Sequence, residues 1–140
     1  MRLTVTQAPD LRTFERIAAT FAAELRAGDV VALAGDLGAG KTTFVAAALR
    51  ALRNGAEVTS PTFTFWHRYG GAPPIEHLDL YRIEDRSEAT ELGLDEALVS
   101  GGIVFVEWPE RLPELVPPHA IRVHIAGCGN APRELRIERP

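Results

Sequence analysis

An apolar run followed at once by a glycine-rich segment places the strongest constraint on this chain. Residues 30–34 read VVALA, which is typical of a strand buried on both faces of a parallel sheet. The segment Gly35–Thr42 follows as GDLGAGKT, and residues 43–53 then carry apolar side chains at helical spacing. The order of strand, glycine loop and helix predicts a P-loop, which holds the phosphates of a nucleotide.

The residue types in this loop suit an anion bound with a metal. Glycines let backbone N–H groups approach phosphate oxygens, and the N-terminus of the following helix adds further donors. The Lys41 side chain supplies a charge for the β and γ phosphates, and the Thr42 hydroxyl is a ligand for Mg²⁺. We therefore expect ATP and Mg²⁺ as cofactors, with contacts from Gly35, Asp36, Gly38, Ala39, Gly40, Lys41, Thr42 and Thr43.

Lysine usage makes a chance match to this pattern improbable. Of the 15 lysine and arginine residues in the chain, Lys41 is the only lysine. A lone lysine placed at random would rarely fall beside both glycines of the pattern and directly before a Thr or Ser. The sequence therefore favours a phosphate loop over a plain glycine-rich turn.

Two acidic residues follow other predicted strands. Glu107 ends the apolar run 103–106 and is our first choice for the acid that binds Mg²⁺ or orders the attacking water. Asp79 follows 75–78 and reaches the same sheet edge if that strand is parallel to the P-loop strand. An ordinary cap or a salt bridge to Arg82 is the alternative for Asp79. The predicted catalytic residues are thus Lys41, Asp79 and Glu107, with Thr42 and Glu107 as metal ligands.

Several nearby side chains have ordinary explanations beside functional ones. Thr62, within SPTF at 60–63, either contacts the γ-phosphate or simply begins a strand. Trp108 either covers the nucleotide or packs at a strand end. His67 and His77 lack metal-ligand spacing, so we interpret both as structural.

The remaining pattern predicts an α/β fold. We expect a largely parallel central sheet, a helix on either side of the P-loop strand and an antiparallel C-terminal extension. Asp10 is a candidate cap for the first helix, which we expect to end at Gly28. The other predicted elements are strands at 3–6, 62–69, 75–80 and 103–106, short helical turns within 84–96, and an antiparallel pair at 121–125 and 134–138.

Composition narrows the classes of protein that this chain can be. Its 140 residues fit a single domain, 1–140. A net charge of -4 gives no overall attraction to nucleic acid, so contact with nucleic acid would come through a partner. No apolar stretch reaches the roughly 20 residues of a membrane span, and the single cysteine, Cys128, fits a reducing compartment. We therefore expect a cytoplasmic protein.

Five motifs occur in a specific order along nearly the whole chain. They are GDLGAGKTTF from Gly35, SPTF from Ser60, HLDLYR from His77, ELGLDE from Glu91 and VEWPER from Val106. In this combination the chain resembles the TsaE family, formerly YjeE. The resemblance runs from the first predicted helix to the last predicted hairpin.

The resemblance implies a small cytoplasmic bacterial ATPase required for the threonylcarbamoyl modification of adenosine 37 in tRNAs that read codons starting with A. Such a protein acts on a complex of the TsaB and TsaD proteins, contacts tRNA only through that complex and has no membrane role. The family residues match, by position, Lys41, Thr42, Thr62, Asp79, Glu107, Trp108 and, as a nucleotide contact in the last turn, Arg133.

Two other functions use the same loop. A small nucleotide or metabolite kinase needs an acceptor pocket and an arginine-bearing lid, and no such lid is evident in the sequence. A non-enzymatic module, in which ATP only switches the surface that a partner meets, needs no hydrolysis. Because no motif supplies an arginine finger, we expect slow ATP hydrolysis without partners.

Overall fold

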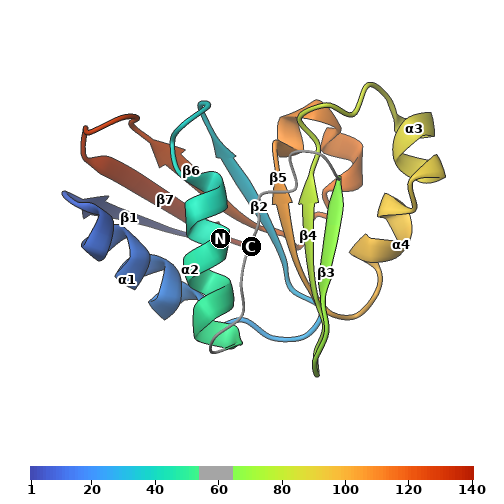
Figure 1. Ribbon diagram of the computed structural model, residues 1–140, viewed down its shortest axis with the longest axis horizontal. Helices are drawn as coiled ribbons and strands as arrows, with labels where there is room; N and C mark the ends of the chain where they lie inside the picture. The colour runs from blue at the N-terminus through green and yellow to red at the C-terminus, as the bar shows by residue number, and fades with distance from the viewer. Residues whose placement is uncertain (54–64) are drawn as a thin grey trace.

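One mixed β-sheet organises the chain (Figure 1). The computed structural model describes residues 1–53 and 65–140, and the strand order in this part is β1-β7-β6-β2-β5-β4-β3. The strands are β1 Arg2–Ala8, β2 Val30–Gly35, β3 Trp66–Tyr69, β4 Ile75–Asp79, β5 Ile103–Glu107, β6 Ile121–Ala126 and β7 Arg133–Arg139. The helices are α1 Leu11–Ala22, α2 Lys41–Leu52, α3 Arg86–Glu91 and α4 Leu94–Leu98, with 3₁₀ turns at Pro109–Arg111 and Pro113–Leu115.

The parallel part of the sheet is its centre. Strands β6, β2, β5 and β4 pair in parallel, whereas β7 and β1 extend one side antiparallel and β3 closes the other. The predicted α/β fold with an antiparallel C-terminal extension is therefore confirmed. Of the strand predicted at 62–69, β3 is the portion observed, and 62–64 lie outside the described residues.

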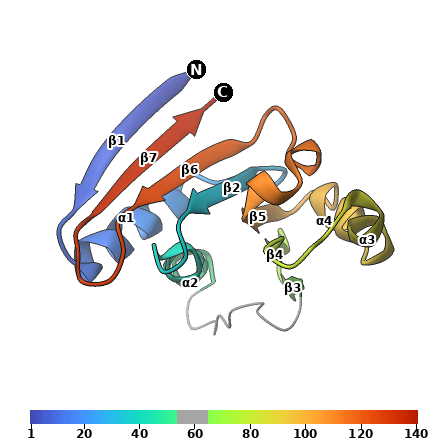
Figure 2. The same ribbon diagram turned by 90° about the horizontal axis from the view of Figure 1, so that it is seen from above.

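Alternating side chains of β2 bury both faces of the sheet. Val31 and Leu33 belong to the core that includes α1 and α2, and Val30 and Ala32 belong to the core that includes α3, α4 and the 3₁₀ turns. The helices that precede and follow β2 in the chain therefore share one face, as Figure 2 shows. Phe44 of α2 packs there against aromatic rings of α1, with ring centroids 6.1 Å from Phe14 and 5.5 Å from Phe21.

Helix α1 is shorter than the sequence pattern predicts. The Asp10 side chain caps it by accepting a bond from the Thr13 N–H at 2.8 Å, as expected. The helix ends at Ala22 and not near Gly28, because the next N–H groups, of Glu24 and Leu25, bond to carbonyls three residues back. The apolar face continues through these tighter turns, which explains why apolar spacing alone overestimated the length of the helix.

The carboxyl ends of three central strands meet at one edge of the sheet. Gly35 ends β2, Asp79 ends β4 and Glu107 ends β5, and Glu107 is in register with both Leu33 and Asp79. Ligand sites in open parallel sheets form at this edge. No helix in the described ranges is long and apolar enough to cross a membrane.

We predict that Gly35→Ala destabilises the protein by about 1–3 kcal/mol through overpacking. A Cβ atom at Gly35 would lie 2.6 Å from the Ile125 carbonyl oxygen, and that backbone is fixed by β2–β6 pairing. Urea unfolding measures the loss. Gly70→Ala is the matched control, because a Cβ there meets no atom within 4 Å; equal losses in both variants would contradict this explanation.

Candidate nucleotide-binding site

The loop between β2 and α2 has the backbone of a phosphate cradle. Gly38 and Gly40 adopt φ angles of +81° and +112°, where glycine is favoured. A side chain at Gly40 would also lie 3.2 Å from the Phe14 ring. Since α2 begins at Lys41, its unpaired N-terminal N–H groups lie directly beside the loop.

Lys41 is folded back into its own loop. Its Nζ atom donates to the carbonyl oxygens of Gly35 at 2.6 Å and Asp36 at 3.0 Å, and it lies 4.1 Å from the centre of a Trp108 ring. Burial lowers the pKa of Lys41, while the nearby negative charge of Glu107 opposes that shift. The side chain thus has a fixed starting position from which it can reach an anion in the loop.

Thr42 and Glu107 meet across the gap between α2 and β5. The Thr42 hydroxyl lies 3.1 Å from each carboxylate oxygen of Glu107, and Glu107 is only 3% exposed. These are the two residues that the sequence predicts as metal ligands. The fold brings their oxygen atoms together although they lie 65 residues apart.

His77 contacts Glu107, and the sequence interpretation did not predict this contact. His77 is fully buried, and its Nε2 atom lies 2.6 Å from the Glu107 Oε2 atom. The available signal was alternation: His77 and Asp79 are two apart on β4, so both side chains point to the face that Glu107 shares. His67, the other histidine interpreted as structural, lies on β3 and stacks on Tyr69 at a ring distance of 6.4 Å.

Asp79 lies beside Glu107 but is less buried. Its Oδ1 atom accepts a bond from the Tyr81 N–H at 2.9 Å, so the predicted alternative of a local cap is partly realised. Partial burial is the main cause that raises the pKa of Asp79, and the charge of Glu107 raises it further. Among the described ion pairs, none joins Asp79 to Arg82.

Several of these side chains line one cavity of about 480 Å³. Its lining includes Lys41, Thr42, Asp79, Glu107 and Trp108. The Trp108 ring packs 4.8 Å from the Tyr81 ring. Trp108 is also the single non-glycine residue with positive φ in the described part, at +60°, a conformation that is rare for a large side chain and clusters at functional sites.

A second hollow of about 440 Å³ lies on the other side of the loop. It shares Gly38, Gly40 and Thr43 with the first and is also lined by Asp10 and Arg133. The Arg133 Nε atom donates to the Ala39 carbonyl at 2.7 Å, and its Nη2 atom donates to the Gly129 carbonyl at 3.1 Å. Arg133 therefore ties the β6–β7 turn to the P-loop backbone.

The predicted site residues thus fall into three groups. Lys41, Thr42, Asp79, Glu107 and Trp108 converge on one cavity, which Gly38, Gly40 and Thr43 also line. Ala39 and Arg133 line the second hollow, and the carbonyls of Gly35 and Asp36 accept the bonds from Lys41. Thr62 lies outside the described residues.

Comparison with known proteins places the chain in a family. The model of the family described as "Threonylcarbamoyl adenosine biosynthesis protein TsaE" matches residues 8–135. The chain belongs to the TsaE family. The TsaE protein of Bacillus subtilis (strain 168) is 42% identical over 120 residues, covering 85% of this chain and 75% of that protein.

More distant relatives agree with this membership of the TsaE family. The TsaE protein of Treponema pallidum (strain Nichols) is 33% identical over 113 residues, covering 81% of this chain and 84% of that protein. The crystal structure of Bacillus subtilis YdiB superposes with a TM-score of 0.80 at 32% identity, covering 99% of this chain and 86% of that one.

The chemistry of the TsaE cavity fits a magnesium ion held jointly with phosphates. In residues 1–53 and 65–140, no group of three or more His, Cys, Asp or Glu residues could hold a metal. Within the same ranges, no Lys or Arg forms an ion pair with the buried Glu107 carboxylate, and its partner His77, 2.6 Å away, balances the charge only when it is protonated. Buried charges are usually paired or bind metals. Mg²⁺ needs only one or two protein carboxylates when phosphates supply other ligands, and Thr42 with Glu107 fits that role.

We predict that Asp79→Asn stabilises the folded protein at pH 7 but not in acid. A raised pKa means that the native state binds the Asp79 proton more tightly than the unfolded chain does, so stability falls as pH rises through the folded pKa. Asparagine keeps the bond acceptor for Tyr81 and removes the charge. Urea unfolding of Asp79→Asn should show a higher free energy of unfolding than the parent at pH 7. This gain should disappear below pH 3.8, the ordinary pKa of an aspartate side chain.

The exposed Glu91→Gln is the control for this measurement, and we expect it to change stability by less than about 0.5 kcal/mol at either pH. A gain for Asp79→Asn that is the same at both pH values would refute the electrostatic explanation.

Proposed function

We propose that this protein binds ATP with Mg²⁺, hydrolyses it, and thereby serves threonylcarbamoyl modification of adenosine 37 in tRNAs that read codons starting with A. The observation that carries the proposal is the convergence of Lys41, Thr42, Asp79 and Glu107 on one cavity beside the glycine loop. The names of the curated relatives, which are tRNA threonylcarbamoyladenosine biosynthesis proteins, support the pathway.

Phosphate binding in this proposal uses the loop amides and Lys41. The lysine exchanges its bonds to the Gly35 and Asp36 carbonyls for bonds to β and γ oxygens. Such charge-assisted bonds are about twice as strong as neutral ones. Trp108 packs against the same ammonium group and excludes water from it. When bound, Mg²⁺ neutralises charge that develops on the phosphate oxygens.

The two acids then have separate tasks. Both Glu107 oxygens are engaged by Thr42, and one is also engaged by His77, which suits a fixed position toward the metal. Asp79 makes one bond to the Tyr81 N–H among the described contacts. A carboxyl with a raised pKa and a free oxygen suits a group that orders water and accepts its proton. We assign Glu107 to the metal and Asp79 to the water.

The nucleoside has a matching place beside the loop. The second hollow begins at the loop residues Gly38 and Gly40 and extends toward Asp10 and Arg133. A nucleotide whose phosphates lie in the glycine loop can extend its ribose and base into this hollow.

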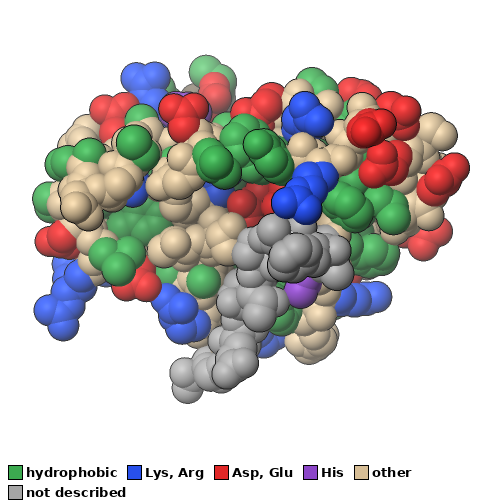
Figure 3. Space-filling view, turned by 45° about the horizontal axis from the view of Figure 1, so that its top comes forward, with side chains coloured by type: hydrophobic (Ala, Val, Ile, Leu, Met, Phe, Trp, Pro, Cys, Tyr) green, Lys and Arg blue, Asp and Glu red, His purple; other side chains and the backbone are tan. Residues whose placement is uncertain are grey.

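Partner proteins would meet the rim of the first cavity. Leu37 and Tyr81 line that cavity and are 74% and 45% exposed, and exposed apolar side chains around a polar site are typical of protein contacts. By family membership we propose TsaB and TsaD as these partners. Figure 3 shows acidic side chains gathered toward the α3 and α4 end, which disfavours direct binding of tRNA there.

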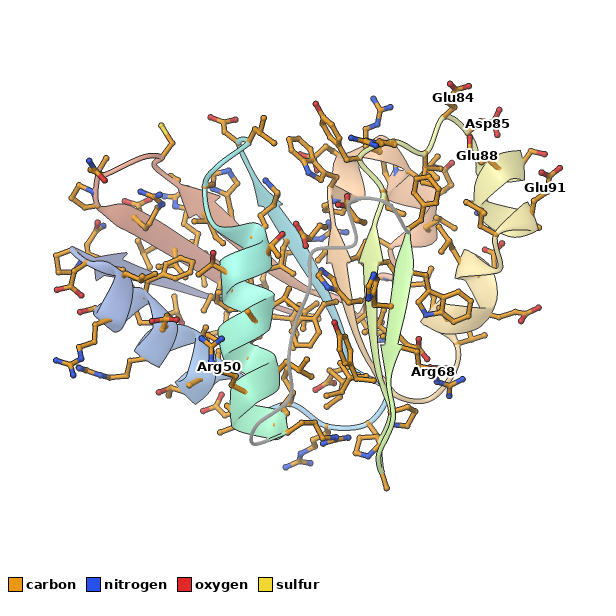
Figure 4. The ribbon with its side chains drawn as sticks, in the orientation of Figure 1. Arg50, Arg68, Glu84, Asp85, Glu88 and Glu91 are labelled. Atoms are coloured by element: carbon orange, nitrogen blue, oxygen red, sulfur yellow. The ribbon has the colours of Figure 1, made fainter. Side chains whose placement is uncertain are left out.

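We predict that Lys41→Ala abolishes support of multiple-turnover tRNA modification in a reconstituted reaction with TsaB and TsaD. The loss should be on the order of a hundredfold or more, because the main cation facing the transferred phosphoryl group is removed. Modified adenosine is counted per partner complex. Arg50→Ala is the control, because Arg50 lies on α2 away from the cavity and pairs with Glu15 at 2.7 Å (Figure 4). Equal modification with Lys41→Ala, or without this protein, would exclude the proposed function.

A separate prediction concerns the metal. Thr42→Ala should remove the gain in ADP affinity that Mg²⁺ gives, by about tenfold or more, and leave affinity in EDTA nearly unchanged. Isothermal titration calorimetry under both conditions measures this difference. Thr42→Ser keeps the hydroxyl and should behave like the parent. Equal weakening of ADP binding with and without Mg²⁺ in Thr42→Ala would exclude Thr42 as a metal ligand.

A further inference from the structure

The Glu107 carboxylate is contacted from two sides, and the two contacts do different things. The Thr42 hydroxyl is 3.1 Å from Oε1 and also 3.1 Å from Oε2. This contact therefore does not distinguish the two oxygens. The His77 Nε2 atom does, because it lies 2.6 Å from Oε2.

The histidine that makes the second contact lies on β4, the strand beside β5. His77 on β4 is in register with Phe105 on β5, two residues before Glu107. Side chains two apart on a strand share a face, so His77 and Glu107 both point toward the face covered by α2. Since an ionised carboxylate can only accept, the bond is donated by Nε2–H.

Burial makes this contact hard to replace. His77 is fully buried and Glu107 is 3% exposed, so little water is available to hold Oε2 if the imidazole is lost. A buried carboxylate without that donor would lose a charge-assisted bond and the restraint on its orientation.

We propose that His77 is a positioning residue, which holds Oε2 of Glu107 and so leaves Oε1 for the metal position beside Thr42. The inference rests on the proposed function, because it assumes that Glu107 serves Mg²⁺. Ligating carboxylates in metal sites are commonly held by such outer bonds, and removing one typically costs 10–100-fold in metal affinity or activity.

The proposal can be separated from a space-filling role by two amide substitutions. In His77→Gln the amide nitrogen reaches roughly as far as the imidazole Nε2, whereas in His77→Asn the amide ends near the Nδ1 position. Both are neutral and polar, and they differ in whether the bond to Glu107 can form and by one methylene group of volume. A role in packing alone does not predict a loss that is confined to the part of ADP affinity that depends on Mg²⁺.

The experiment measures ADP affinity of the full chain by calorimetry, with Mg²⁺ and with EDTA. His77→Gln should keep most of the gain that Mg²⁺ gives to the parent. His77→Asn should lose about tenfold of that gain, with affinity in EDTA unchanged. Thermal unfolding of each variant checks that the fold is intact.

The outcomes distinguish this inference from the proposed function. A parent chain that does not bind ADP, or gains no affinity from Mg²⁺, overturns the proposed function. A normal parent with a full Mg²⁺ gain in His77→Asn overturns the positioning role alone. Equal losses in His77→Gln and His77→Asn also overturn it, since the reach of the donor would then not matter.

A measurement on the unmodified chain covers the case in which His77→Asn does not fold. In a ¹⁵N-histidine-labelled sample, the buried His77 Nε2–H should give a slowly exchanging proton signal. That signal should shift when ADP and Mg²⁺ are added, and should be lost in Glu107→Ala. Absence of the signal in the parent, or its persistence unchanged in Glu107→Ala, would overturn the proposed bond.

Discussion

The parallel register of β2, β5 and β4 is the constraint on which the candidate site depends. It sets Glu107 opposite both Leu33 and Asp79, and Leu33 lies two residues before Gly35, where the P-loop begins. A shift of one residue along β5 would turn Glu107 to the opposite face of the sheet. The apolar alternation that buries Phe105 on one face and Val104 on the other therefore also fixes the orientation of the Glu107 carboxylate.

Two buried glutamates on adjacent strands differ in the partners that contact their carboxylates. Glu76 on β4 is balanced by Arg68 (labelled in Figure 4), whose Nε atom lies 3.1 Å away, and Glu76 also accepts a bond from Trp66. Glu107 has a histidine and a hydroxyl as its described partners. The first arrangement is an ion pair that links β3 to β4. The second leaves negative charge beside the phosphate loop, where a divalent cation can compensate it.

Local sequence signals predicted which residues lie together at the candidate site better than they predicted the contacts that support them. The glycine loop and the strand-end acids could be identified from the sequence because each depends on residues that are contiguous or periodic. The contact between His77 and Glu107 could not be identified in this way, because the two residues lie 30 positions apart and a single histidine forms no spacing pattern. The common face of α1 and α2 likewise depends on contacts of Phe44 with Phe14 and Phe21, and such tertiary packing is not encoded in either helix alone.

The bond between Arg133 and the P-loop has a consequence for the order of events during synthesis. Arg133 is 94 residues beyond Ala39, whose carbonyl it holds, and β6, a direct neighbour of β2, begins at Ile121. On the ribosome, where the N-terminal part emerges first, the glycine loop is therefore made long before the strand and the arginine that hold it in place. A nascent chain that ends before β7 has the whole glycine loop but lacks Arg133, which bonds to the loop backbone.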